Sequence, residues 1–182
     1  MGKIGLFILS LFGWKIDKTP PTVSKCVVCM GPHTSNWDFV IGRLTFSYYG
    51  VNTKFLIKKE LFRPPFGGLM RKMGGIPVDR KHKNNMTKVA VEEFKKTDNL
   101  FLVFTPEGTR KYNSHWKKGF YHIALEAKVP IYVAYIDYKN KTGGWDSLFE
   151  PTGDVDADIK EIKKRLSKYT GKVPENGIRA ED

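Results

Sequence analysis

The sequence predicts a single α/β domain with a largely parallel β-sheet flanked by helices. Strand-like and helix-like segments alternate from residue 22 onward, and the strand-like segments are short and apolar. Such alternation places a helix in each crossover between parallel strands. The chain has 182 residues, of which 41% are hydrophobic. This length is within the usual range for one domain with its own core.

Five strands are expected, each an apolar run rich in β-branched residues. They are residues 22–30, 53–58, 76–79, 100–104 and 131–138. Helical patterns lie between them and after the last one. They are residues 37–49, 66–73, 86–97 and 117–128, with a charged helix from about Val155 to Tyr169. Residues 139–154 indicate turns around one more short strand, and residues 171–182 indicate a flexible tail.

An almost unbroken apolar run, Ile4–Trp14, occupies the N-terminus. Crossing a bilayer takes about 20 such residues, so this run is too short to span one. It also lacks the small-residue cleavage site of a signal peptide. Because Lys3, Lys15 and Lys18 flank it, we expect residues 1–18 to form an apolar helix at a membrane interface. The alternative is a helix that packs on the domain's own core.

The chain is strongly basic, with 31 Lys and Arg against 19 Asp and Glu, a net charge of +12. This excess favours an anionic partner, which can be nucleic acid, an anionic bilayer or an acidic carrier protein. The basic residues are spread along the chain, without an RNP, KH or zinc-finger pattern. We therefore expect no nucleic-acid partner.

Two cysteines, Cys26 and Cys29, lie in the first expected strand. Their three-residue offset places them on opposite faces of that strand, which argues against a disulfide or a shared metal ion. No second Cys pair exists to complete a zinc site, so we expect no metal. Two free, buried cysteines are typical of a protein in a reducing cytoplasm.

The loop after the first strand reads Gly31-Pro-His-Thr-Ser-Asn-Trp-Asp38 and joins it to a helix. In α/β domains, chemistry gathers in loops at the carboxyl ends of strands. At this spacing Asp38 can accept from Nδ1–H of His33, which leaves Nε2 free to take a proton from an alcohol. No Ser or Cys nucleophile is implied, so the pair suits direct attack by a substrate hydroxyl on an activated acyl group. The alternative is a loop histidine beside a carboxylate that stabilises a helix N-terminus.

Three further motifs follow in order along the chain. They are Gly74-Gly-Ile-Pro-Val-Asp-Arg80, Phe104-Thr-Pro-Glu-Gly-Thr-Arg110 and Val129-Pro-Ile131. Together with His33 and Asp38, they resemble the four ordered signatures of the glycerolipid acyltransferase family, the lysophosphatidic acid acyltransferases and their relatives. The resemblance spans about residues 30–131 and includes Lys58-Lys-Glu-Leu-Phe62.

The resemblance implies that residues 19–170 form an acyltransferase domain. It would move a fatty acyl group from acyl-CoA or acyl carrier protein to the hydroxyl of a lysophospholipid-like acceptor, with 1-acylglycerol 3-phosphate favoured. His33 would be the general base and Asp38 its orienting partner. The resemblance assigns substrate binding to Lys58, Arg80, Glu107, Gly108, Thr109 and Arg110.

Within that set, the basic side chains match positions that contact anionic groups. Arg110 and Lys58 would hold the acceptor phosphate and Arg80 would make a further anion contact, as guanidinium and ammonium groups do. Glu107 would brace its loop or Arg110. Gly108 would let backbone N–H groups approach an oxygen, or would simply form a tight turn.

The sequence leaves the identity of the acyl donor and that of the acceptor open. An acidic acyl carrier protein suits a basic surface, and the acceptor can also be an amino-acid lysolipid or glycerol 3-phosphate. No cofactor is expected besides the acyl co-substrate. With the N-terminal anchor, these features predict a peripheral protein on the cytoplasmic face of the cell membrane. The non-enzymatic alternatives are a lipid-binding or a nucleic-acid-binding module, against which the His33 and Asp38 pair argues.

Overall fold

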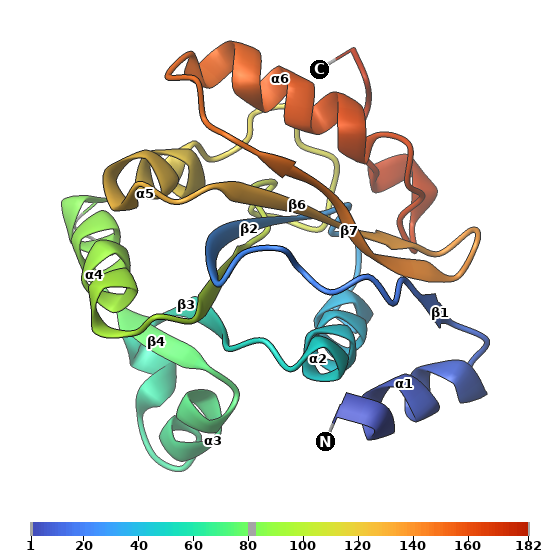
Figure 1. Ribbon diagram of the computed structural model, residues 1–182, viewed down its shortest axis with the longest axis horizontal. Helices are drawn as coiled ribbons and strands as arrows, with labels where there is room; N and C mark the ends of the chain where they lie inside the picture. Colours follow the sequence, from blue (N-terminus) through green and yellow to red (C-terminus); the bar gives the residue numbers. More distant parts are fainter. Residues whose placement is uncertain (1, 80–82, 182) are drawn as a thin grey trace.

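The computed structural model describes residues 2–79 and 83–181. Its centre is one seven-stranded sheet in the order β1-β7-β6-β2-β5-β3-β4 (Figure 1). The strands are β1 (Lys15–Ile16), β2 (Lys25–Gly31), β3 (Thr53–Lys58), β4 (Gly75–Val78), β5 (Leu100–Phe104), β6 (Ile131–Asp137) and β7 (Thr142–Phe149). Adjacent strands pair in parallel except β6 and β7, which are antiparallel. The predicted fold class, an α/β domain with a largely parallel sheet, is confirmed.

Helices cover both faces of this sheet (Figure 1). They are α1 (Gly2–Leu11), α2 (Trp37–Tyr49), α3 (Gly67–Lys72), α4 (Lys83–Lys96), α5 (Gly119–Ala127) and α6 (Val155–Leu166), with the short 3-10 helices η1 (Lys59–Phe62) and η2 (Pro174–Asn176). One core layer lies between the sheet and α1 and α2. The other lies between the sheet and α4, α5 and α6.

Strand β2 lies at the middle of the sheet, and its sequence KCVVCMG is buried almost throughout. A central parallel strand is covered on both faces, which explains why its apolar run is continuous rather than alternating. Cys26 packs in the layer with α1 and α2, and Cys29 packs in the opposite layer. Both cysteines are free, and burial raises the pKa of each thiol. The two cysteines therefore lie on opposite faces of the strand, as their offset of three residues predicts.

Strands β1 and β7 differ from what the sequence indicated. The two residues of β1 pair in parallel with β7 at the sheet edge, and so short a strand leaves no detectable pattern. The eight residues of β7 form a full strand rather than a short one. Gly143 and Gly144 favour turns locally, but pairing with β6 along the whole strand overrides this preference.

Helix α1 packs on α2 through its small residues. Gly5 lies against the backbone of Leu44, where an added Cβ would approach the Leu44 carbonyl oxygen to 2.7 Å. On the same helix Leu9 is buried, whereas a stripe of large apolar side chains is 62% to 68% exposed. The stripe consists of Ile4, Phe7, Leu11 and Phe12. Among the described residues, no helix is long and apolar enough to cross a membrane.

Residues 171–181 are not the flexible tail that their composition indicated. Ile178 is only 9% exposed and belongs to the core layer that contains α5 and α6. The backbone N–H of Val173 donates to Oγ1 of Thr34 over 3.2 Å. The backbone N–H of Tyr112 donates to the side-chain oxygen of Asn176 over 3.3 Å. A polar segment can thus be fixed by one apolar anchor and a few hydrogen bonds, which its composition does not reveal.

Candidate active site

The loops after three neighbouring strands meet at one edge of the sheet. Strand β2 lies between β5 and β6 and is parallel to both, so the carboxyl ends of all three face the same way. The loop after β2 carries His33, the loop after β5 carries Glu107, and Tyr138 directly follows β6. Such an edge is where α/β domains bind ligands.

His33 and Asp38 form the hydrogen-bonded pair that their spacing predicts. His33 Nδ1 lies 3.0 Å from Asp38 Oδ2. The same oxygen accepts from the backbone N–H groups of Thr34 and Ser35, each over 2.8 Å. The other oxygen, Oδ1, accepts from the hydroxyl of Tyr138 over 2.6 Å. The carboxylate is therefore held by four donors at the start of α2.

The electrostatics favour a charged Asp38, whose carboxylate can accept a hydrogen bond from Nδ1–H of His33. Burial alone would raise the pKa of Asp38, but the hydrogen bonds from His33, Tyr138 and Ser35 outweigh it, and the pKa lies below its usual value. Burial and the bond to Asp38 raise the pKa of Tyr138, so its hydroxyl stays a donor. The His33 side chain is 22% exposed, which leaves Nε2 open to a substrate.

Glu107 contacts the same loop from the other side. Its Oε1 accepts from the backbone N–H of His33 over 2.8 Å, and the residue is 2% exposed. Burial raises the pKa of Glu107 to about 8, and the charge of Asp38 adds to this effect, although the bond from His33 opposes it. A largely neutral carboxyl group at neutral pH can keep accepting this bond without an unpaired buried charge. The contact places Glu107 as a brace of the His33 loop rather than of Arg110.

Gly108 forms the tight turn that was one of its two expected roles. Its φ is +67°, in the left-handed region, and an added Cβ would lie 2.8 Å from Cε of Lys117. Its own N–H donates to the carbonyl oxygen of Thr105 over 3.1 Å. That N–H is therefore committed to the turn, and the approach of other backbone N–H groups to a substrate oxygen stays a prediction.

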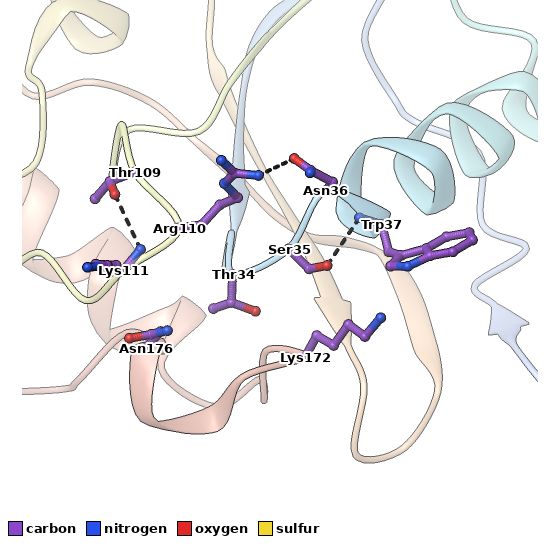
Figure 2. A pocket seen from close by; sticks show the side chains of 9 residues that line it. All are labelled: Thr34, Ser35, Asn36, Trp37, Thr109, Arg110, Lys111, Lys172 and Asn176. Carbon is purple, nitrogen blue, oxygen red and sulfur yellow. Dashed lines mark hydrogen bonds between the residues drawn. The ribbon is translucent and has the colours of Figure 1, made fainter.

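A pocket of about 660 Å³ is lined in part by residues 34–37, which lie between His33 and Asp38 in the sequence, although neither member of the pair lines it. Figure 2 shows its lining, which comes from the His33 loop, the loop after β5 and the C-terminal segment. The lining residues are Thr34, Ser35, Asn36, Trp37, Thr109, Arg110, Lys111, Lys172 and Asn176. The Arg110 guanidinium donates to the side-chain oxygen of Asn36. The lining contains three cations and no carboxylate, so the pocket favours an anionic group.

The structure brings together most of the predicted site residues. Thr109 and Arg110 line the pocket, and Glu107 contacts the histidine loop. Lys58 ends β3 and is exposed, but it does not line this pocket. Arg80 lies outside the described residues.

Several residues that the structure places at this edge of the sheet were not predicted from the sequence as site residues. Tyr138 was assigned only to a strand, although a polar side chain at a strand's carboxyl end is the signal that singled out His33. Lys111 directly follows the recognised motif. Lys172 and Asn176 lie in the segment interpreted as a tail, where no local signal marks them.

Comparison with known proteins agrees with this geometry. The family model described as Acyltransferase matches residues 15–137. No curated protein matches the chain significantly. Among solved structures, the crystal structure of the 1-acyl-sn-glycerophosphate (LPA) acyltransferase PlsC from Thermotoga maritima matches with a TM-score of 0.63 and 17% identity, over 90% of this chain and 73% of that chain. At this identity the likeness shows a shared fold. Because the family model matches more than half of the chain, this protein belongs to the acyltransferase family, as its motifs predicted.

Proposed function

We propose that this acyltransferase moves a fatty acyl group from a thioester donor to the hydroxyl of a lysophospholipid-like acceptor, with 1-acylglycerol 3-phosphate favoured. The donor is acyl-CoA or acyl carrier protein. The observation that carries the proposal is an oriented, partly exposed His33 beside a pocket lined by three cations and no carboxylate. A base and an anion pocket side by side suit an acceptor that has both a hydroxyl and a phosphate.

The reaction follows from the atoms at the site. Nε2 of His33 takes the proton of the acceptor hydroxyl as its oxygen attacks the thioester carbonyl carbon. The new C–O bond forms, the C–S bond breaks, and the leaving thiolate takes the proton from the imidazolium. Asp38 stabilises that imidazolium through the 3.0 Å contact to Nδ1. Arg110 binds the acceptor phosphate and thereby holds the hydroxyl near the base.

A panel of substrates tests this proposal. The purified protein is incubated with long-chain acyl-CoA or acyl carrier protein and with lysophosphatidic acid, glycerol 3-phosphate, an amino-acid lysolipid or monoacylglycerol. We expect the highest kcat/KM for lysophosphatidic acid. Preference for another acceptor would reassign the substrate, and the absence of transfer to every acceptor would favour a lipid-binding protein on the same fold.

The exposed stripe of α1 supports a peripheral location on the cytoplasmic leaflet of the cell membrane. Ile4, Phe7 and Leu11 recur at helical spacing on α1 and are solvent-exposed, as is Phe12 directly after the helix, while Leu9 packs inside. Such a helix can insert its exposed apolar face at the boundary between lipid head groups and acyl chains without crossing the bilayer. The positive charge of the protein adds attraction to anionic lipids.

The double substitution Phe7→Glu and Leu11→Glu should weaken binding to anionic vesicles. The expected loss is roughly tenfold or more, because burying one large apolar side chain contributes about 1.5 to 3 kcal/mol. Vesicle co-sedimentation measures it, and Ser10→Glu on the same helix is the control for added charge. Deleting residues 1–14 is a poorer test because it also removes the buried Leu9 and Trp14. Equal binding of the double variant and wild type would place the membrane contact elsewhere.

Tyr138→Phe should lower kcat/KM by about 3- to 10-fold, since the hydroxyl is one of four donors to Asp38 and the loss of one such bond costs about 0.7 to 1.4 kcal/mol. The Tyr138 bond is one of the contacts that lower the pKa of Asp38, so without it that pKa should rise and the carboxylate should be protonated at a higher pH. The acidic limb of the pH–rate profile should therefore move to higher pH. A lower rate with an unmoved profile would show that Tyr138 only packs against the loop.

A further inference from the structure

The C-terminal segment 171–178 is fixed against the His33 loop at several points. An added Cβ at Gly171 would lie 2.6 Å from Cγ2 of Thr34, so only glycine allows this approach. The backbone N–H of Val173 donates to Oγ1 of the same threonine. Upstream, the N–H of Tyr138 donates to the carbonyl oxygen of Thr170 over 2.8 Å. Downstream, Ile178 is buried in the core. The segment is thus held at both ends and forms one wall of the pocket.

Lys172 lies on this wall and reaches over Trp37. Its Nζ is 5.4 Å from the centre of the Trp37 ring, within the range of a cation–π contact. Figure 2 shows Lys172 on the C-terminal segment, with Arg110 and Lys111 on the loop after β5. Within residues 2–79 and 83–181, none of these three cations forms an ion pair with a carboxylate. The pocket therefore has a positive charge that its own lining does not neutralise.

We propose that Lys172, together with Arg110 and Lys111, binds a phosphate monoester of a substrate. A monoester has close to two negative charges at neutral pH, whereas a diester has one. A zwitterionic head group would bring an additional positive charge toward three cations. The inference rests on the proposed function and narrows it, because it selects substrates with a terminal phosphate over diester and zwitterionic lysolipids.

Two substrates of the proposed reaction supply this chemical group. One is the head group of lysophosphatidic acid, and the other is the 3′-phosphate of CoA. The prosthetic arm of acyl carrier protein has a phosphodiester and no monoester. Comparing acyl-CoA with acyl carrier protein as donor therefore distinguishes binding of the acceptor phosphate from binding of the CoA 3′-phosphate.

The test compares Lys172→Ala with Lys168→Ala, which removes the same charge from an exposed side chain outside the pocket. The KM for lysophosphatidic acid is measured at saturating donor, and the KM for each donor at saturating acceptor. We expect Lys172→Ala to raise one monoester KM about tenfold with little change in kcat, as for loss of a charge-assisted contact. A higher KM for lysophosphatidic acid would show that Lys172 binds the phosphate of the acceptor. A higher KM for acyl-CoA but not for acyl carrier protein would show that it binds the 3′-phosphate of the donor. Lys172→Arg should keep most of the affinity.

A binding measurement keeps the inference testable without turnover. Calorimetric titration with glycerol 3-phosphate should show weaker binding to Lys172→Ala than to Lys168→Ala, and glycerophosphoglycerol, a diester, should bind wild type more weakly than the monoester. Unchanged KM values and equal binding in both variants would overturn the inference while leaving the acyltransfer proposal intact. Failure of wild type to transfer an acyl group would instead reject the proposed function, and the titration would still decide whether Lys172 binds a monoester.

Discussion

His33→Ala should lower kcat for acyl transfer by about 10² to 10⁴-fold, the usual cost of deleting a general base. Its Nδ1 lies 3.0 Å from Asp38 Oδ2 and its side chain is 22% exposed, so Nε2 is the ring nitrogen available to the acceptor hydroxyl. The KM for the acceptor should change little, because the phosphate contacts come from other residues. Initial rates and the thermal unfolding midpoint are measured together.

The matched control for this variant is His122→Ala, an exposed histidine on α5 that does not line the pocket. It should keep the wild-type rate. A folded His33→Ala protein with near wild-type turnover would show that another group accepts the proton.

Asp38→Asn should lower kcat by roughly 10²-fold or more, since it removes the negative charge that stabilises the imidazolium. Three N–H donors, from His33, Thr34 and Ser35, converge on one oxygen and would keep the amide oxygen in that place. The amide nitrogen would then face Tyr138, whose hydroxyl can turn to accept from it. The loop should therefore keep its shape while the rate falls.

Asp156→Asn is the control for loss of one negative charge, because this exposed residue pairs with Lys118 on the surface. Its rate should equal that of wild type. If Asp38→Asn retained the wild-type rate as well, Asp38 would have a structural role in capping the loop and no part in the chemistry.

Much of this fold was predictable because its signals are local. The strand β2 is a continuous apolar run, and the helix that follows it has apolar residues at helical spacing, so both were predicted within a few residues of their observed ends. The pair of His33 and Asp38 was predictable for the same reason, since only four residues separate them.

The remaining site residues depend on contacts between distant parts of the chain. Tyr138 and Asp38 are 100 residues apart in the sequence and meet because β6 lies next to β2 in the sheet. Lys172 reaches the pocket because Gly171 can lie against Thr34 and Ile178 enters the core. Neither contact leaves a periodic pattern in the sequence, so composition indicated a tail where the structure has a pocket wall.

The central claim is that the acceptor hydroxyl attacks the thioester directly, with His33 as base and no acyl-enzyme intermediate. Rapid mixing of a stoichiometric amount of acyl-CoA with the protein, followed by intact-protein mass measurement and thiol release, tests this claim most directly. We expect no acylated protein, and thiol release only after acceptor is added, in step with formation of the acylated product. A burst of thiol in the absence of acceptor, with an acyl group covalently bound to the protein, would contradict it.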